Sequence, residues 1–258
     1  MKVDLHVGVN YFSELALGNI PGRTYVNKFG SAPDGIQTTN TDIWSRADAT
    51  PTQQIWLAPT AARVHAIVSS STLDTGFNVT VYGLQSWSSA ETSETIALTG
   101  TTPVNTVNSY VIIHRMKCVW TASKTTNAGN ITATAAVNNT VTAFIAIGDG
   151  QTEMAIYGVP SGKVALIHRW SCNMDRVVGT TPITVNFVLL VNENPSVQTV
   201  GFLRKSDISL ISFGTSEHER RYTPPIPVVG PAIIKVQATA STADTEGESS
   251  FDLEIVDL

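Results

Sequence analysis

From about residue 60 to the last residue, the chain repeats short runs in which apolar and polar positions alternate and β-branched residues are frequent. Residues 64–68, 78–82, 183–190 and 233–238 are clear examples, and Gly, Asn, Asp and Ser separate the runs. A period of two is typical of half-buried strands, and no stretch sustains the 3.6-residue period of a helix. The pattern therefore predicts an all-β protein, an antiparallel β-sandwich or jelly roll, rather than a sheet with crossover helices.

The strand pattern divides into two halves. Gly148-Asp149-Gly150 is the clearest break in it, because Gly-Asp-Gly favours a turn and contributes nothing to a core. We therefore expect two β-sandwich units, at residues 59–148 and 149–258, and the sequence leaves open whether they are separate domains.

Residues 1–58 differ from the rest of the chain. Residues 11–17 predict a turn or two of helix that ends at Gly18, and a polar, turn-rich stretch follows. Large hydrophobic residues occur there only at wide intervals, which predicts an extended N-terminal arm that packs on its own body or on a neighbour. Because Trp is enriched among interface hot spots, the predicted interface residues are Phe29, Ile43, Trp44 and Trp56. The β body is expected to fold without the arm.

Composition excludes several classes of protein. Hydrophobic residues make up 42% of the chain, which is ordinary for a globular protein, and no apolar run approaches the roughly 20 residues of a spanning helix. The net charge is −5 and there is no basic stripe, so we expect neither nucleic-acid nor membrane binding. The N-terminus shows no signal-peptide pattern, which predicts synthesis in a cytoplasm and makes the two cysteines free thiols.

One six-residue motif occurs twice: Ile-His-Arg-x-x-Cys, at residues 113–118 and 167–172. A His and a Cys four residues apart on one strand lie about 13 Å apart, too far to share one metal ion. A site shared between the two strands, or a bridge between Cys118 and Cys172, stays an alternative to a buried, neutral role for both histidines. Arg115 and Arg169 alternate away from these residues and are expected to face solvent or a partner.

No motif of nucleophilic, phosphate-binding or metalloprotease chemistry is present. The one dense charge cluster, at residues 217–222, is expected to be a solvated strand end or an interface patch. We therefore predict no enzymatic activity, no cofactor and no metal.

Four stretches resemble a known class of proteins. They are residues 149–167, with Gly-Gln-Thr, Ala-Ile-Tyr and Val-Pro-Ser-Gly-Lys; residues 79–84; residues 95–104; and the ending at 222–258. The sequence resembles virion structural proteins of tailed bacteriophages. The resemblance implies a protein located in the virion, most of all one that decorates or cements the capsid by contacts with the major capsid protein or a neighbouring virion protein. It also implies a homotrimer.

Three alternatives stay open. A neck, tail or head-fibre component would bind a receptor or a glycan, and Trp87 is the predicted glycan-stacking residue. A jelly-roll shell protein would show the same pattern of short alternating strand segments. A polysaccharide depolymerase would need clustered carboxylates in a groove, which the sequence does not show.

Overall fold

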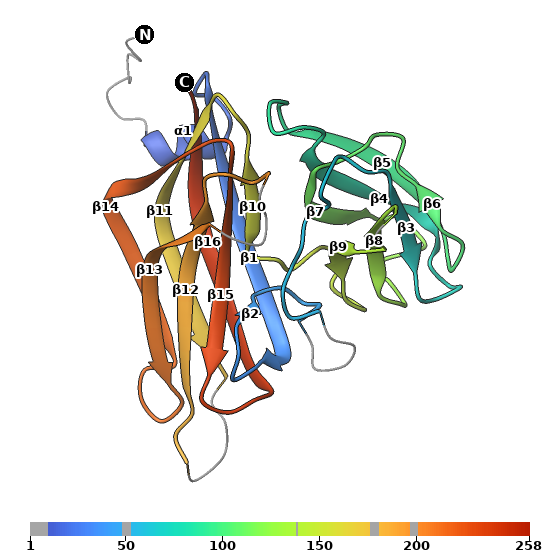
Figure 1. Cartoon of the computed structure of the whole chain (residues 1–258). Coiled ribbons are helices and arrows are strands. Elements are labelled where there is room, and N and C mark those ends of the chain that lie inside the picture. The colour runs from blue at the N-terminus through green and yellow to red at the C-terminus, as the bar shows by residue number, and fades with distance from the viewer. Residues whose placement is uncertain (1–9, 48–52, 138, 176–180, 197–200) are drawn as a thin grey trace.

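The computed structural model describes residues 10–47, 53–137, 139–175, 181–196 and 201–258, and Figure 1 shows two β-sandwiches side by side. The smaller sandwich has a sheet of order β6-β3-β8-β9 and a second sheet of order β5-β4-β7. Its strands are β3 (His65–Ser69), β4 (Thr75–Leu84), β5 (Thr92–Thr99), β6 (Val104–Asn105), β7 (Ile112–Val119), β8 (Ile131–Ala135) and β9 (Val141–Ile145).

The larger sandwich is built from both ends of the chain. One sheet has the order β1-β16-β11-β14, and the other has the order β10-β15-β12-β13, with β2 paired to β15. Its strands are β1 (Arg23–Ile36), β2 (Thr41–Asp42), β10 (Ile156–Val159), β11 (Lys163–Met174), β12 (Thr184–Asn192), β13 (Phe202–Ile211), β14 (Glu217–Val229), β15 (Ala232–Ala240) and β16 (Thr245–Asp257). All strand pairs in both sandwiches are antiparallel, so the predicted all-β sandwich fold is confirmed.

Burial follows the alternation of the sequence. On β11, Trp170, Cys172 and Met174 are buried between the two sheets, while the residues between them face outward. β3 and β8 show the same strict alternation of buried and half-buried positions in the smaller sandwich. The described strands therefore place their apolar side chains where a period-two pattern predicts them.

The N-terminal segment corrects one expectation. It is extended, but its described part forms strands of the larger sandwich: β1 pairs with β16 from Arg23 to Ile36, and β2 pairs with β15. The body therefore cannot be expected to keep its fold without this segment, because β16 would lose a neighbouring strand. Residues 1–9 and 48–52 of the predicted arm lie outside the described residues.

A short helix precedes β1, as the sequence predicts. α1 (Tyr11–Ala16) is capped by Asn10, whose side chain accepts a hydrogen bond from Phe12 N at 3.0 Å, and Gly18 follows it at a φ of 74°. α1 lies at the end of the larger sandwich that also holds the C-terminus (Figure 1).

The two sandwiches share one hydrophobic core and are joined by backbone pairing. After leaving the smaller sandwich, the chain runs along the edge of β7: Cys118 N donates to Gly150 O at 2.7 Å, and Thr152 N donates to Met116 O at 2.9 Å. β10 follows and lies beside β7 in Figure 1. The predicted break at residues 148–150 is thus a turn between two sandwiches that pack against each other. Among the described residues, no helix is long and apolar enough to cross a membrane.

Candidate functional site

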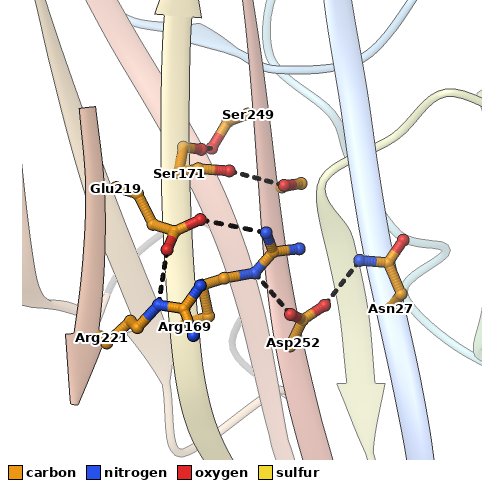
Figure 2. A network of polar contacts seen from close by, with 8 residues as sticks. Asn27, Arg169, Ser171, Glu219, Arg221, Ser249 and Asp252 are labelled. Atoms are coloured by element: carbon orange, nitrogen blue, oxygen red, sulfur yellow. Dashed lines mark hydrogen bonds and ion pairs between the residues drawn. The ribbon is translucent and has the colours of Figure 1, made fainter. Parts of the chain in front are cut away.

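The outer face of the sheet β1-β16-β11-β14 carries the densest arrangement of polar side chains. Strand register places alternate residues of all four strands on it, and we call this surface the polar face (Figure 2). Its side chains come from β1 (Asn27, Phe29, Ser31), β16 (Glu248, Ser250, Asp252), β11 (Arg169, Ser171, Asn173) and β14 (Glu217, Glu219, Arg221).

A chain of ion pairs and hydrogen bonds crosses the polar face from strand to strand. Arg169 Nε donates to Asp252 at 2.6 Å, and Arg169 Nη1 donates to Glu219 at 3.1 Å. Glu219 also accepts from Arg221 Nε at 2.7 Å, and Asp252 accepts from Asn27 Nδ2 at 2.6 Å. Figure 2 shows these contacts following one another across the four strands. The side chains are therefore held in place by their neighbours.

The ion pairs change the acidity of both carboxyl groups. Burial by itself would raise the pKa of Asp252, but hydrogen bonds from Arg169, Asn27 and Tyr25 outweigh it, and the pKa lies below its ordinary value. Hydrogen bonds from Arg221 and Arg169 lower the pKa of Glu219. Both groups are thus charged at neutral pH, and neither is poised to donate a proton.

A hollow of about 520 Å³ lies at one end of the polar face. It is lined by Phe29, Gly30, Ser31, Glu153, Ser171, Cys172, Asn173, Glu217, His218, Glu219, Glu248, Ser249 and Ser250. Burial raises the pKa of Glu153, and the carboxylates of Asp149 and Glu248 add to this. The hollow combines an aromatic ring with hydroxyl, amide and carboxylate groups.

The other end of the polar face is covered by α1. Glu254 on β16 is buried there and accepts hydrogen bonds from Tyr11 and Arg23, and its second oxygen lies 3.1 Å from His168 Nε2. The ring of Phe12 packs edge-on against His168 at 5.7 Å. A β-bulge at His168 turns this side chain to the outer face, where it is 26% exposed, which corrects the expectation that both motif histidines are buried.

A second polar cluster lies where the two sandwiches meet. Lys28 is buried and donates to the carbonyl oxygen of His114, and His114 Nε2 lies 2.7 Å from Glu91. The His114 ring stacks on Tyr157 with centroids 4.6 Å apart. Burial holds the pKa of Lys28 well below its ordinary value, and the neighbouring Arg115 guanidinium lowers it further. This cluster joins β1, β7 and β10 and has no open access to solvent at Lys28 or His114.

In the described part of the chain, the hydrogen bonds of histidine side chains go to carbonyl or carboxylate oxygens, not to a hydroxyl or a thiol. Within the same residues, no group of three or more His, Cys, Asp or Glu is arranged to hold a metal ion. Both cysteines are free and buried, and burial raises the pKa of each thiol to about 12.

The predicted interface residues lie in two environments. Ile43, Trp44 and Trp56 are buried in the chain's own core, where Trp56 Nε1 donates to Thr142 O at 2.8 Å. They are therefore not accessible anchors, because their neighbours in this chain already cover them. Phe29 is half-buried and lines the hollow.

Trp87, the predicted glycan-stacking residue, is half-buried and packs against the core. Its carbonyl oxygen accepts a hydrogen bond from Ser161 N at 2.7 Å. The loop of Trp87 thus contacts the larger sandwich.

The polar face itself was not apparent from the sequence. Arg169 was expected to face solvent or a partner, and residues 217–222 stood out as a charge cluster, but the pairing of Arg169 with Asp252 joins positions 83 residues apart. Only the register of β11 against β16 brings them together. Alternating acidic residues at 248, 252 and 254 were the available signal.

Comparison with known proteins adds little to this description. No family model and no curated protein matches the chain. Among solved structures, a virus structure described as "Structure of infectious bursal disease virus Gt strain" is similar at 9% identity with a TM-score of 0.19, over 96% of this chain and 78% of that one.

Proposed function

We propose that this chain is a structural protein of a tailed-bacteriophage virion, which decorates or cements the capsid by binding the major capsid protein or another virion protein through its polar face. The observation that carries the proposal is the chain of hydrogen bonds and ion pairs from Asn27 to Arg221, which orders polar side chains on four long strands. The resemblance in the sequence supplies the virion context.

The ordered face suits binding for a physical reason. A protein–protein interface loses affinity when flexible side chains must be immobilised on association. Here Arg169, Asp252 and Glu219 already hold one another, so less conformational entropy remains to be lost. The hydroxyl and amide groups beside them can then form the hydrogen bonds of a polar interface.

The location is tested by quantitative mass spectrometry of purified particles. Hundreds of copies per particle are expected for a decoration or shell protein, and comparison with the major shell protein separates these two. A few to a few dozen copies would place the chain in a neck, fibre or tail. Complete absence from the particle would overturn the proposal.

The role of the polar face is tested by a matched pair of variants. Asn173→Arg puts a bulky cation on the exposed polar face, and Ser209→Arg makes the same charge change on exposed β13 of the other sheet. We expect at least about tenfold lower occupancy on stripped particles for Asn173→Arg, and normal occupancy for Ser209→Arg. Equal occupancy of both variants would mean that another surface binds the particle.

The hollow favours one alternative, a receptor- or glycan-binding component of a neck, fibre or tail. An aromatic ring beside hydroxyl, amide and carboxylate groups is a suitable lining for a saccharide. Saturable binding on a glycan array that is lost in Phe29→Ala would support this alternative. Loss in Trp87→Ala instead would place the site at the loop between β4 and β5.

A further inference from the structure

β14 is the outermost strand of its sheet, and its first half is exposed on both faces. Residues Glu217 to Arg221 are all exposed, whereas most other long strands bury at least every second residue. The Arg221 side chain is 77% exposed. Among the described strands, only β11 pairs with β14, so the other edge of β14 presents unpaired backbone N–H and C=O groups.

The hydrogen-bond pattern shows which backbone groups face this open edge. Met174 N donates to Ser216 O at 2.9 Å, and the register then continues without a shift from Asn173↔Glu217 to Arg169↔Arg221. In an antiparallel pair, hydrogen-bonded and non-hydrogen-bonded positions alternate. His218 and Arg220 therefore direct their backbone groups to β11, and Glu217, Glu219 and Arg221 direct theirs to the free edge.

The order of charges along this edge is self-complementary, because two antiparallel copies of the strand bring opposite charges together. If a second copy of the strand runs antiparallel to the first with Glu219 at the centre, Glu217 of each copy lies opposite Arg221 of the other. Within the described residues, Glu217 makes no hydrogen bond or ion pair through its side chain, so it is free to accept one from a partner. Opposite charges at directly paired positions stabilise strand pairing.

The segment available for pairing is limited at both ends. On one side the strand contains three prolines, which have no backbone N–H to donate to a neighbouring strand: Pro224, Pro225 and Pro227. On the other side, the turn before β14 closes with hydrogen bonds from Gly214 N to Ile211 O and from Ile211 N to Thr215 O. Glu219 lies midway between Gly214 and Pro224, so the strand offers a short edge that is symmetric about one residue.

We propose that β14 binds the β14 strand of a second copy of this chain, antiparallel and about a two-fold axis at Glu219. Three residue pairs then form hydrogen bonds: Glu217 with Arg221, Glu219 with Glu219, and Arg221 with Glu217. The two four-stranded sheets become one continuous sheet, with both polar faces on the same side. The inference goes beyond the virion role and does not rest on it.

The like charges at the axis are already neutralised within each copy. Each Glu219 accepts from Arg169 and Arg221, so two cations accompany each of the two carboxylates. Mixed charge on an edge discourages pairing with arbitrary strands. A self-complementary order of charges favours one partner in one register, and that partner is a second copy.

Two single variants test the pairing by light scattering at a range of protein concentrations. Glu217→Arg makes both 217/221 contacts Arg–Arg, and Arg221→Glu makes both Glu–Glu. Each variant alone should dimerise at least about tenfold more weakly than the wild type. An equimolar mixture should recover dimers, because both contacts then join opposite charges. Arg204→Glu, at an exposed position of β13, is the matched control and should dimerise normally.

Wild-type dimers, weakened in each variant and recovered in the mixture, support the pairing. A wild-type monomer from micromolar to submillimolar concentration overturns it, and so does the three-fold assembly that the sequence resemblance implies. Dimers that both variants leave unchanged also overturn it, since they must use another surface. Particle occupancy is measured separately, so failure of this inference leaves the proposed virion role to its own test.

Discussion

The strands β7 and β11 carry the same motif, Ile-His-Arg-x-x-Cys, and the structure gives both the same local form. The register of each strand shifts at the histidine, so His114 and His168 both occupy a β-bulge. Each histidine contacts a glutamate through Nε2, and each cysteine points into a core. The repeat therefore specifies a bulged strand, a device that bends a strand and redirects one side chain.

The surroundings make the two histidines different. β7 is an edge strand of its sheet, and the larger sandwich packs over His114, which is 2% exposed. β11 is an inner strand, and His168 faces outward beneath Phe12 with its side chain 26% exposed. The same local sequence thus places His114 in the buried contact between the two sandwiches and His168 on the surface of the larger one.

The two sandwiches also differ in how the chain builds them, which the largest predicted effect tests. The smaller one comes from one continuous segment, whereas the larger one needs β1 and β2 from the N-terminal region. A chain that begins at residue 48 should lose the cooperative thermal unfolding transition of the larger sandwich, because β16 loses its β1 ladder. Thermal melts followed by near-UV circular dichroism, which reports the packing of aromatic side chains such as Trp170, measure this. A truncated chain with wild-type packing and melting would contradict the discontinuous architecture.

A pH titration distinguishes the sandwiches by their histidines. In the smaller one, burial lowers the pKa of His65 to about 4 and also lowers that of His114. The unfolded state then binds protons at higher pH than the folded state. The His65 contribution is fully present above about pH 6.5 and is lost as the pH falls toward 4, on the order of 3 kcal/mol of unfolding free energy.

Urea denaturation at several pH values between 7.5 and 4.5 measures this loss. His65→Gln should flatten the pH dependence, because glutamine takes up no proton in this range. A wild-type unfolding free energy that does not fall across this range would contradict the assignment.

Substitution of the two motif histidines sharpens the comparison directly. His114→Ala removes the stack on Tyr157 and the contact with Glu91 and leaves a cavity between the sandwiches, so we expect a loss of about 2–3 kcal/mol. His168→Ala should cost at most about 1 kcal/mol, since Glu254 keeps Tyr11 and Arg23 as partners. Chemical denaturation of both variants measures the two losses in unfolding free energy. Equal losses would show that the contribution of each histidine depends on the bulge and not on its surroundings.

The motif arginines give the smallest expected difference. Arg169→Met leaves Asp252, which is 9% exposed, without its ion pair and should cost about 1–3 kcal/mol. Arg115→Met removes one hydrogen bond, from Nη2 to the carbonyl oxygen of Asn27 at 2.6 Å, and should cost about 1 kcal/mol. Differential scanning calorimetry of the pair would show the order, and a larger loss for Arg115→Met would reverse our ranking of the two contacts.

The burial of Trp44 and Trp56 in the N-terminal region depends on contacts that the sequence does not reveal. Trp44 and Trp56 stood out as anchors because they are large and isolated, but isolation in the sequence does not say which surface covers them. The segment just before β10 and strand β9 supply the contacts: Trp44 forms a backbone bridge with Met154, and Trp56 Nε1 donates to Thr142 O. The same holds for the buried ion pair of Asp42 with Lys235 at 2.7 Å, whose members are 193 residues apart.

The all-β class and the short helix before β1 can be predicted from the sequence alone. These features depend on alternation, capping and turn residues, which act over a few neighbouring positions. The strand order, the β-bulges at both motif histidines, the polar face and the burial of His114 but not His168 become visible only in the folded structure. These depend on register between distant strands, because a side chain's burial and charge partners are set by whatever the fold packs against it.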